Sequence, residues 1–100
     1  MKYQFTDQGK KEFDEAMAFY DSRIRGLGLE LFLDFEKTLN RLLHFPESAL
    51  PLPQGVRKAV LGNFPFNIIY QVENDILFIL AFMHQKRKPG YWKNRMTRKK

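Results

Sequence analysis

The stretch FPFNIIYQVENDILFILAFMH, residues 64–84, decides the fold of this chain. Apolar side chains fill most of Phe66–Val72 and nearly all of Ile76–Met83, and short apolar runs of this kind are typical of buried β-strands. A Glu-Asn-Asp triplet at 73–75 separates the two runs with residues that favour a tight turn. The sequence therefore predicts an antiparallel hairpin, whose second strand is central and covered on both faces.

Further strands are predicted on either side of this hairpin in the sequence. Val56–Leu61 has a β-like composition, and Gly62–Pro65 turns the chain between it and the hairpin. Lys2–Phe5 alternates polar and aromatic residues, as an edge or entry strand does. An irregular crossing segment is expected where three prolines cluster, at Pro46, Pro51 and Pro53.

The region between the first strand and the prolines has the periodicity of two amphipathic helices. Thr6 and Asp7 are candidate caps for the first helix, Gly26 and Gly28 break it, and Pro46 forbids continuation of the second. The apolar stripes are Phe13, Met17, Tyr20, Ile24 and Leu27, then Leu29, Phe32, Phe35, Leu39, Leu42 and Leu43.

Together these elements predict a single domain over residues 1–100. Their order is β-α-α-β-β-β, which is an α+β fold with a helical hairpin packed on one face of an antiparallel sheet.

Positive charge is concentrated at the C-terminal end. Residues 84–100 contain eight Lys and Arg and no carboxylate, whereas the other 83 residues contain nine basic and eleven acidic side chains. The whole net charge of +6 therefore arises from this end. Such a separation predicts a surface that meets an anionic partner, either nucleic acid or an acidic protein segment.

Other features limit the class of protein. The chain has no cysteine, its N-terminus lacks an apolar signal region, and its longest apolar run is eight residues. We therefore expect a cytoplasmic protein without a membrane partner. It has no Gly-rich phosphate loop, carboxylate cluster or histidine pair with metal-ligand spacing, so we expect no metal, no cofactor and no small-molecule substrate.

Two segments, residues 55–72 and 79–95, resemble the RelE/ParE superfamily of toxins from bacterial toxin–antitoxin modules. The first has a Gly-hydrophobic-Arg strand start and a Phe-Pro-aromatic run that ends in Tyr, and the second has the ending H-x-x-R-x-P-x-Y-W. The resemblance covers almost the whole chain, and it implies the element order predicted above. The residues that carry it are Gly55, Val56, Arg57, Phe64, Pro65, Phe66 and Tyr70, then His84, Arg87, Pro89, Tyr91 and Trp92.

The resemblance implies one of two activities. RelE-like members cut mRNA in the ribosomal A site, whereas ParE-like members poison DNA gyrase and are not nucleases. In this chain Phe45–Val56 contains no Lys or Arg, and the helices are long, as in ParE-like members. We therefore expect a ParE-like toxin that inhibits growth. A RelE-like ribosome-dependent endoribonuclease is the alternative, and a plain nucleic-acid-binding module remains open.

An RNA-cleaving site would draw on five residues at the ends of the predicted strands: Arg57, Lys58, His84, Arg87 and Tyr91. Metal-free cleavage needs fixed cations to stabilise the charge of the phosphate, and it needs His or Tyr to move the proton. If the first and last sheet strands are neighbours, these side chains could converge on one phosphate.

Several residues of these regions also have an ordinary structural interpretation. His84 could bond to backbone at the end of its strand, and Arg87 could pair with a helix carboxylate such as Glu36. Trp92 could be a lid packed on the sheet. Arg57 alternates with apolar Val56, so it faces away from the core or is paired.

A toxin of this type implies a cognate antitoxin with an acidic amphipathic helix or strand. This partner could bind the basic C-terminal region and cover apolar residues left exposed on the helices. Leu31 and Leu33 lie off the main stripe of the second helix, so we expect both to be exposed. The residues assigned to target or antitoxin binding are Leu31, Leu33, Arg87, Trp92, Lys93 and Arg95.

Overall fold

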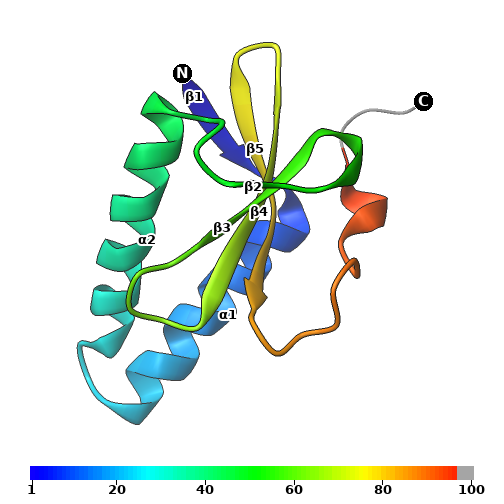
Figure 1. Ribbon diagram of the computed structural model, residues 1–100. Coiled ribbons are helices and arrows are strands. Elements are labelled where there is room, and N and C mark those ends of the chain that lie inside the picture. The colour runs from blue at the N-terminus through cyan, green and yellow to red at the C-terminus, as the bar shows by residue number, and fades with distance from the viewer. Residues whose placement is uncertain (97–100) are drawn as a thin grey trace.

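Two helices pack on one face of a five-stranded sheet in the computed structural model, which describes residues 1–96 (Figure 1). The strand order in the sheet is β1-β5-β4-β3-β2. The predicted α+β class and the order β-α-α-β-β-β are confirmed. The elements are β1 (Lys2–Phe5), α1 (Asp7–Arg23), α2 (Leu27–His44), β2 (Leu50–Pro51), β3 (Val56–Val60), β4 (Phe66–Glu73) and β5 (Ile76–His84), with short 3-10 turns at Pro53–Gly55 and Lys93–Arg95.

The β4–β5 hairpin forms as the sequence predicts. Asn74 and Asp75 connect the strands with φ angles of 53° and 64°, the left-handed conformation that two-residue hairpin turns require. β5 lies between β4 and β1 and is buried over most of its length. The hairpin therefore provides the centre of the sheet.

The sheet is mixed, whereas the sequence predicted an antiparallel one. β1 pairs with β5 in parallel, from Lys2 opposite Ile76 to Phe5 opposite Ile79. The sequence pattern identifies a strand at Lys2–Phe5, but pairing direction depends on a partner more than seventy residues away. β2 was not predicted at all, because it is a two-residue strand within the proline-rich crossing segment.

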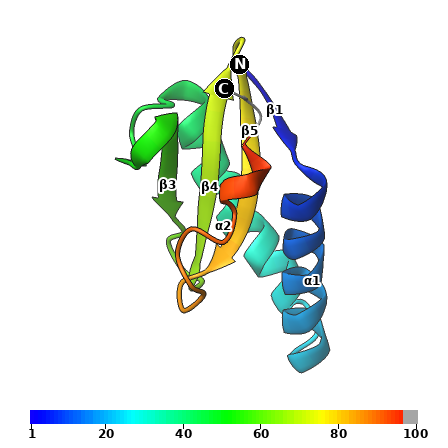
Figure 2. The same ribbon diagram turned by 90° about the vertical axis from the view of Figure 1, so that its right-hand side faces the viewer.

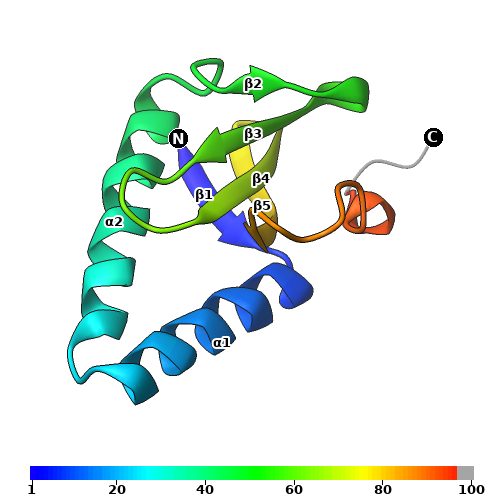
Figure 3. The ribbon, with the colours of Figure 1, turned by 60° about the horizontal axis from the view of Figure 1, so that its bottom comes forward.

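The helical hairpin depends on one cap and two glycines. The Thr6 hydroxyl accepts a hydrogen bond from the Gly9 amide (3.1 Å), which confirms Thr6 as the N-cap of α1. Gly26 has a φ of 91° and supplies the turn. Gly28 serves a different purpose, because a Cβ there would lie 2.8 Å from the carbonyl oxygen of Met17. Gly28 therefore lets α2 approach α1 closely, and the two helices diverge from this turn (Figure 3).

The first turns of α2 are rotated relative to the sequence prediction. Leu31 is fully buried (0% exposed), so the expectation that it is exposed was wrong. Leu29, expected in the core, is 61% exposed, and Ile24 at the end of α1 is 64% exposed. Leu33 is 53% exposed, as predicted. Leu31 lies four residues before Phe35, on the buried stripe that Leu39 and Leu42 continue, whereas the sequence prediction ran the stripe through Leu29. The contact of Gly28 with α1 is consistent with this rotation.

The two faces of the sheet are covered differently. The helix side holds a core of aromatic and aliphatic residues, in which the Phe13 and Phe35 rings lie 4.5 Å apart. The opposite face, here called the free face, carries a smaller cluster that includes Ile69, Met83 and Trp92. Figure 2 shows that the chain after β5 returns across this free face.

Candidate functional site

The chain after β5 forms a cationic segment, defined here as residues 86–95, that lies over the free face. Trp92 is buried (6% exposed) and packs with the apolar residues of that face, which confirms that it is a lid on the sheet. Four of the five basic side chains of the segment are exposed: Lys86, Arg87, Lys88 and Lys93. The segment thus buries its indole and presents its charge to solvent.

The fifth basic residue, Arg95, attaches the segment to the body of the protein. Its Nη1 donates to Glu12 Oε1 on α1 (3.0 Å) and to the carbonyl oxygen of Leu80 on β5 (3.1 Å). The side chains of Arg95 and Glu12 are 12% and 17% exposed, so this ion pair is largely shielded from water. Sequence reasoning assigned Arg95 to partner binding, but these contacts give it a structural role.

Glu12 also completes the hydrogen bonding of β5. The ladder with β1 ends at Ile79, so the next backbone groups on that edge have no strand partner. Glu12 Oε1 accepts from the Phe82 amide (3.1 Å), and the Thr6 hydroxyl donates to the carbonyl oxygen of Leu80 (3.2 Å). Side chains from α1, its N-cap and the cationic segment therefore satisfy this part of the sheet edge.

Tyr91 lies between two arginines of the same segment. The Arg87 guanidinium carbon is 3.9 Å and that of Arg95 is 5.0 Å from the centre of its ring, which are cation–π distances. Burial and the nearby Glu12 carboxylate raise the pKa of Tyr91 to about 12. The phenol is therefore neutral at physiological pH. Arg87 is held by this stacking, and the ion pair considered for it with Glu36 does not form among the described residues.

A groove of about 460 Å³ lies between β3 and the cationic segment. Its lining includes Lys58 and Val60 from β3, the buried floor residue Ile69, and Pro89 and Trp92 from the segment. Lys58 is the charged residue of that lining, so the groove is a mainly apolar surface with one cation.

Arg57 lies on the other face of β3, toward the helices. Its Nη1 donates to the carbonyl oxygens of Ala49 (2.8 Å) and Glu47 (3.3 Å), so the guanidinium is paired with backbone, one of the interpretations considered above. It borders a separate cavity of about 270 Å³ with Tyr70, whose hydroxyl donates to the carbonyl oxygen of Pro46 (2.6 Å). Burial raises the pKa of Tyr70, although Arg57 and Arg41 oppose the shift.

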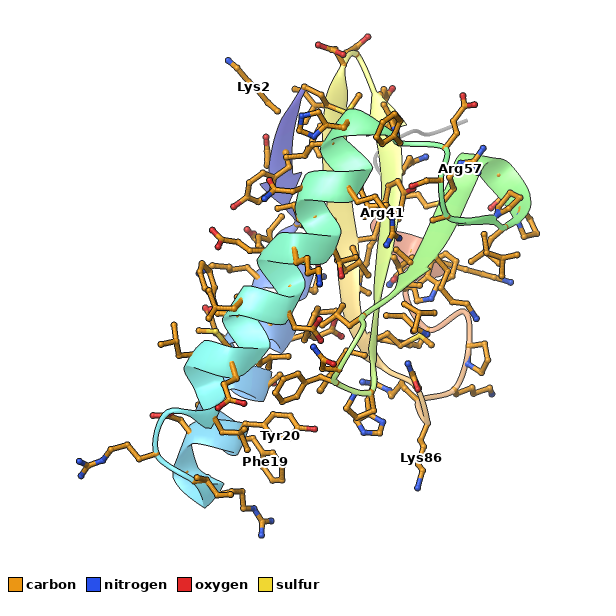
Figure 4. All side chains as sticks on the ribbon, turned by 60° about the vertical axis from the view of Figure 1, so that its left-hand side comes forward. Lys2, Phe19, Tyr20, Arg41, Arg57 and Lys86 are labelled. Carbon is orange, nitrogen blue, oxygen red and sulfur yellow. The ribbon has the colours of Figure 1, made fainter. Side chains whose placement is uncertain are left out.

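His84 lies at the opposite end of the sheet from Arg57. It pairs with Phe66, four residues along β4 from the partner of Arg57, a separation of roughly 14 Å along the strand. The ring contacts the Phe66 ring, and Nδ1 accepts from the Lys86 amide (3.1 Å), which confirms the backbone-bonded interpretation. Figure 4 shows Lys86 at this same end, far from Arg57.

The structure therefore does not gather the five nuclease candidates at one point. Arg57 and Lys58 face opposite sides of β3, and His84 is distant from Arg57. Arg87 and Tyr91 are together, but they stack on each other in the cationic segment. Residues 1–96 contain no group of three or more His, Cys, Asp or Glu that could hold a metal ion. In the same residues, no helix combines the length and apolarity needed to cross a bilayer.

The fold and the attached cationic segment define a small α+β protein with a helical hairpin on one face of its sheet. Comparison with known families gives a match to the ParE toxin of type II toxin–antitoxin systems over residues 3–89. The chain belongs to this family. A solved structure described as the chromosomal ParDE toxin–antitoxin system from P. aeruginosa has the same fold, with a TM-score of 0.71 and 20% identity over 84% of this chain and 95% of that one. A comparison with curated proteins found no match.

Proposed function

We propose that this protein is a ParE-like toxin that arrests growth by poisoning DNA gyrase, in the cytoplasm, and that a cognate antitoxin neutralises it. Membership of the ParE toxin family supports the toxin role. The similar fold in a structure described as a toxin–antitoxin system supports an antitoxin partner.

The dispersal of the nuclease candidates favours this proposal over mRNA cleavage. Cleavage without a metal needs a cation and a proton-transferring group at the same phosphate. Here Arg57 donates to two carbonyl oxygens, and Lys58 lies on the opposite face of its strand. Tyr91, with a pKa of about 12, is a poor base at neutral pH. A toxin that acts by binding a protein target does not need a cation and a proton-transferring group at one point.

The exposed cations of the segment are the proposed contacts for the target. Lys86, Arg87, Lys88 and Lys93 project from a segment that contains no carboxylate, so they present one sign of charge. A surface patch with one sign of charge accelerates association with an oppositely charged partner and orients that partner. Trp92 takes part only indirectly, because its burial leaves it little surface for contact.

The antitoxin is proposed to combine acidic and apolar residues. Its carboxylates would pair with the cationic segment, and its apolar side chains would cover exposed residues on the helices. Leu33, half exposed on α2, is the candidate apolar contact, and Leu31 is excluded by its burial.

The deciding experiment measures DNA breakage and mRNA cleavage in cells that express the toxin without its antitoxin. We expect induction to generate DNA breaks and filaments, and the purified protein to inhibit supercoiling by gyrase. A triple variant, Lys86→Glu, Lys88→Glu and Lys93→Glu, should lose both effects. A control with the same change of charge elsewhere, Lys2→Glu, Lys11→Glu and Arg25→Glu, should keep them.

Unimpaired supercoiling in the presence of excess toxin would refute the gyrase proposal. Codon-phased cuts in mRNA from induced cells, mapped by primer extension and lost in Arg87→Ala, would establish the ribosome-dependent alternative instead.

A further inference from the structure

We propose that Glu12 is a positioning residue, which holds the cationic segment on the free face in the geometry that its target recognises. This inference rests on the proposed function for its biological consequence. Its structural part, the dependence of the segment on Glu12, can be tested independently of any target.

Glu12 joins three parts of the molecule at one atom. It comes from α1, and its Oε1 accepts from Arg95 of the segment and from the Phe82 amide of β5. Within residues 1–96, this is the one ion pair that connects the segment to the rest of the protein. Because both side chains are largely shielded from water, these charge-assisted hydrogen bonds are stronger than their counterparts on the surface.

Removal of Glu12 would deprive two groups of a partner. The Phe82 amide would lose its acceptor, and Arg95 would keep a shielded positive charge without a counter-charge. Both changes are unfavourable, and movement of the segment into water relieves the second. Arg95 also contributes to the stack on Tyr91, so this movement would disturb the arrangement that fixes Arg87.

A fixed position of the segment favours binding to a target. Four exposed basic side chains on a loosely held segment would sample many arrangements, and a target would have to order them on binding. A segment fixed by Glu12 has already lost that freedom when the protein folds. Glu12 therefore contributes to recognition without touching the partner.

The experiment uses the full chain with Glu12→Ala, Glu12→Gln, Arg95→Ala and the double variant Glu12→Ala with Arg95→Ala. Asp14→Asn is the matched control, because Asp14 is also an α1 carboxylate in an ion pair, with Lys10, but both side chains are more than half exposed. Trp92 is the only tryptophan of the chain, so its fluorescence reports the position of the segment directly. Circular dichroism identifies the variants that keep the fold.

We expect Glu12→Ala and Arg95→Ala each to shift Trp92 emission to the red and to increase its quenching by acrylamide. The double variant should add little, because both single changes break the same contact. Exchange of the Phe82 amide should be about tenfold faster or more in Glu12→Ala, given the loss of a charge-assisted hydrogen bond. Glu12→Gln should have a smaller effect on this amide, since it keeps an acceptor. Asp14→Asn should leave all of these readouts unchanged.

Two results would overturn the inference. Trp92 emission and Phe82 exchange that match the parent protein in Glu12→Ala would refute the structural part. A folded Glu12→Ala variant that exposes Trp92 but inhibits growth and gyrase as strongly as the parent would refute the positioning role. The second result leaves the proposed function intact, because the proposed function fails if the parent protein, in excess, does not impair supercoiling by gyrase.

Discussion

The two faces of the sheet differ in how they are covered, and we infer that one mainly stabilises the fold while the other mainly presents a binding surface. On the helix side, α1 and α2 cover a continuous core in which the Phe66 and Phe82 rings stack 4.6 Å apart. On the free face, one short segment covers the sheet, held by the buried Trp92 and by the ion pair of Glu12 with Arg95. We infer that the helix side supplies most of the folding free energy, whereas the free face presents charge on a cover that can be altered without unfolding the domain.

The largest effect is expected from Phe35→Ala on the helix side. Phe35 is 2% exposed and packs against the rings of Phe5, Phe13 and Phe82, so truncation should cost about 3–5 kcal/mol. That is a large part of the roughly 5–15 kcal/mol that stabilises an ordinary domain. Urea unfolding followed by circular dichroism measures the change, with the exposed Leu33→Ala as control. Equal free energies of unfolding for the two variants would show that the helix-side core does not supply most of the folding free energy.

Asp34→Ala should lower the free energy of unfolding by a smaller amount. This variant tests the hydrogen bonds that connect α2 to the sheet. The Asp34 carboxylate accepts from the amides of Gly62, Asn63 and Phe64 at 3.2, 2.8 and 3.0 Å, in the turn between β3 and β4. Its removal leaves three donors without this acceptor and should cost about 2–4 kcal/mol. Glu36→Ala, an exposed α2 carboxylate, should change the unfolding midpoint little. Comparable midpoints for the two variants would show that the turn does not depend on Asp34.

Trp92→Ala should lower the free energy of unfolding less than Phe35→Ala does, although both side chains are buried. The indole is covered by one segment, which can move off the free face while the helix side stays folded. We expect the loss of unfolding free energy to fall below the ~3–5 kcal/mol typical of a truncated buried Trp, with faster hydrogen exchange confined to β5 and the cationic segment. A loss as large as that of Phe35→Ala, with exchange accelerated throughout the domain, would remove the distinction between the two faces.

The smallest effect is the dependence of folding stability on pH that arises from Tyr91. Its pKa is about 12 in the folded state and about 10 for an unperturbed tyrosine, so the folded state holds this proton more tightly. The contribution to stability is complete below about pH 10 and is lost as the pH rises from there through about 12. An ultraviolet titration should show late-ionising tyrosines, because the pKa of Tyr70 is raised as well, and Tyr91→Phe should remove one of them. Ionisation of Tyr91 near pH 10 would contradict its placement beside Glu12.

The sequence predicts the features of the fold that local patterns determine. The β4–β5 hairpin follows from two apolar runs around a turn triplet, and the Thr6 cap follows from its place before α1. The rotation of the first turn of α2 was mispredicted, because the apolar stripe was started at Leu29 and not at Leu31, which lies four residues before Phe35. The close contact of Gly28 with α1 agrees with this rotation, and it forms only with the helical hairpin.

The candidate site was predicted in its composition but not in its arrangement. The excess of positive charge and the aromatic pair identify the cationic segment from the sequence alone. The separation of Arg57 from Lys58 follows from strand alternation, but which face each side chain takes depends on the core. Glu12 was missed entirely, since it lies 83 residues from Arg95 and nothing in its local sequence distinguishes it from other helix carboxylates.

The most direct test of the account is the binding of the purified protein to gyrase, measured at low and at physiological salt. The account predicts that affinity falls as salt screens the charges, and that the triple variant with Lys86→Glu, Lys88→Glu and Lys93→Glu binds weakly at both salt concentrations. Affinity that is unaffected by salt and equal in the parent and the triple variant would contradict the claim that the cationic segment is the docking surface.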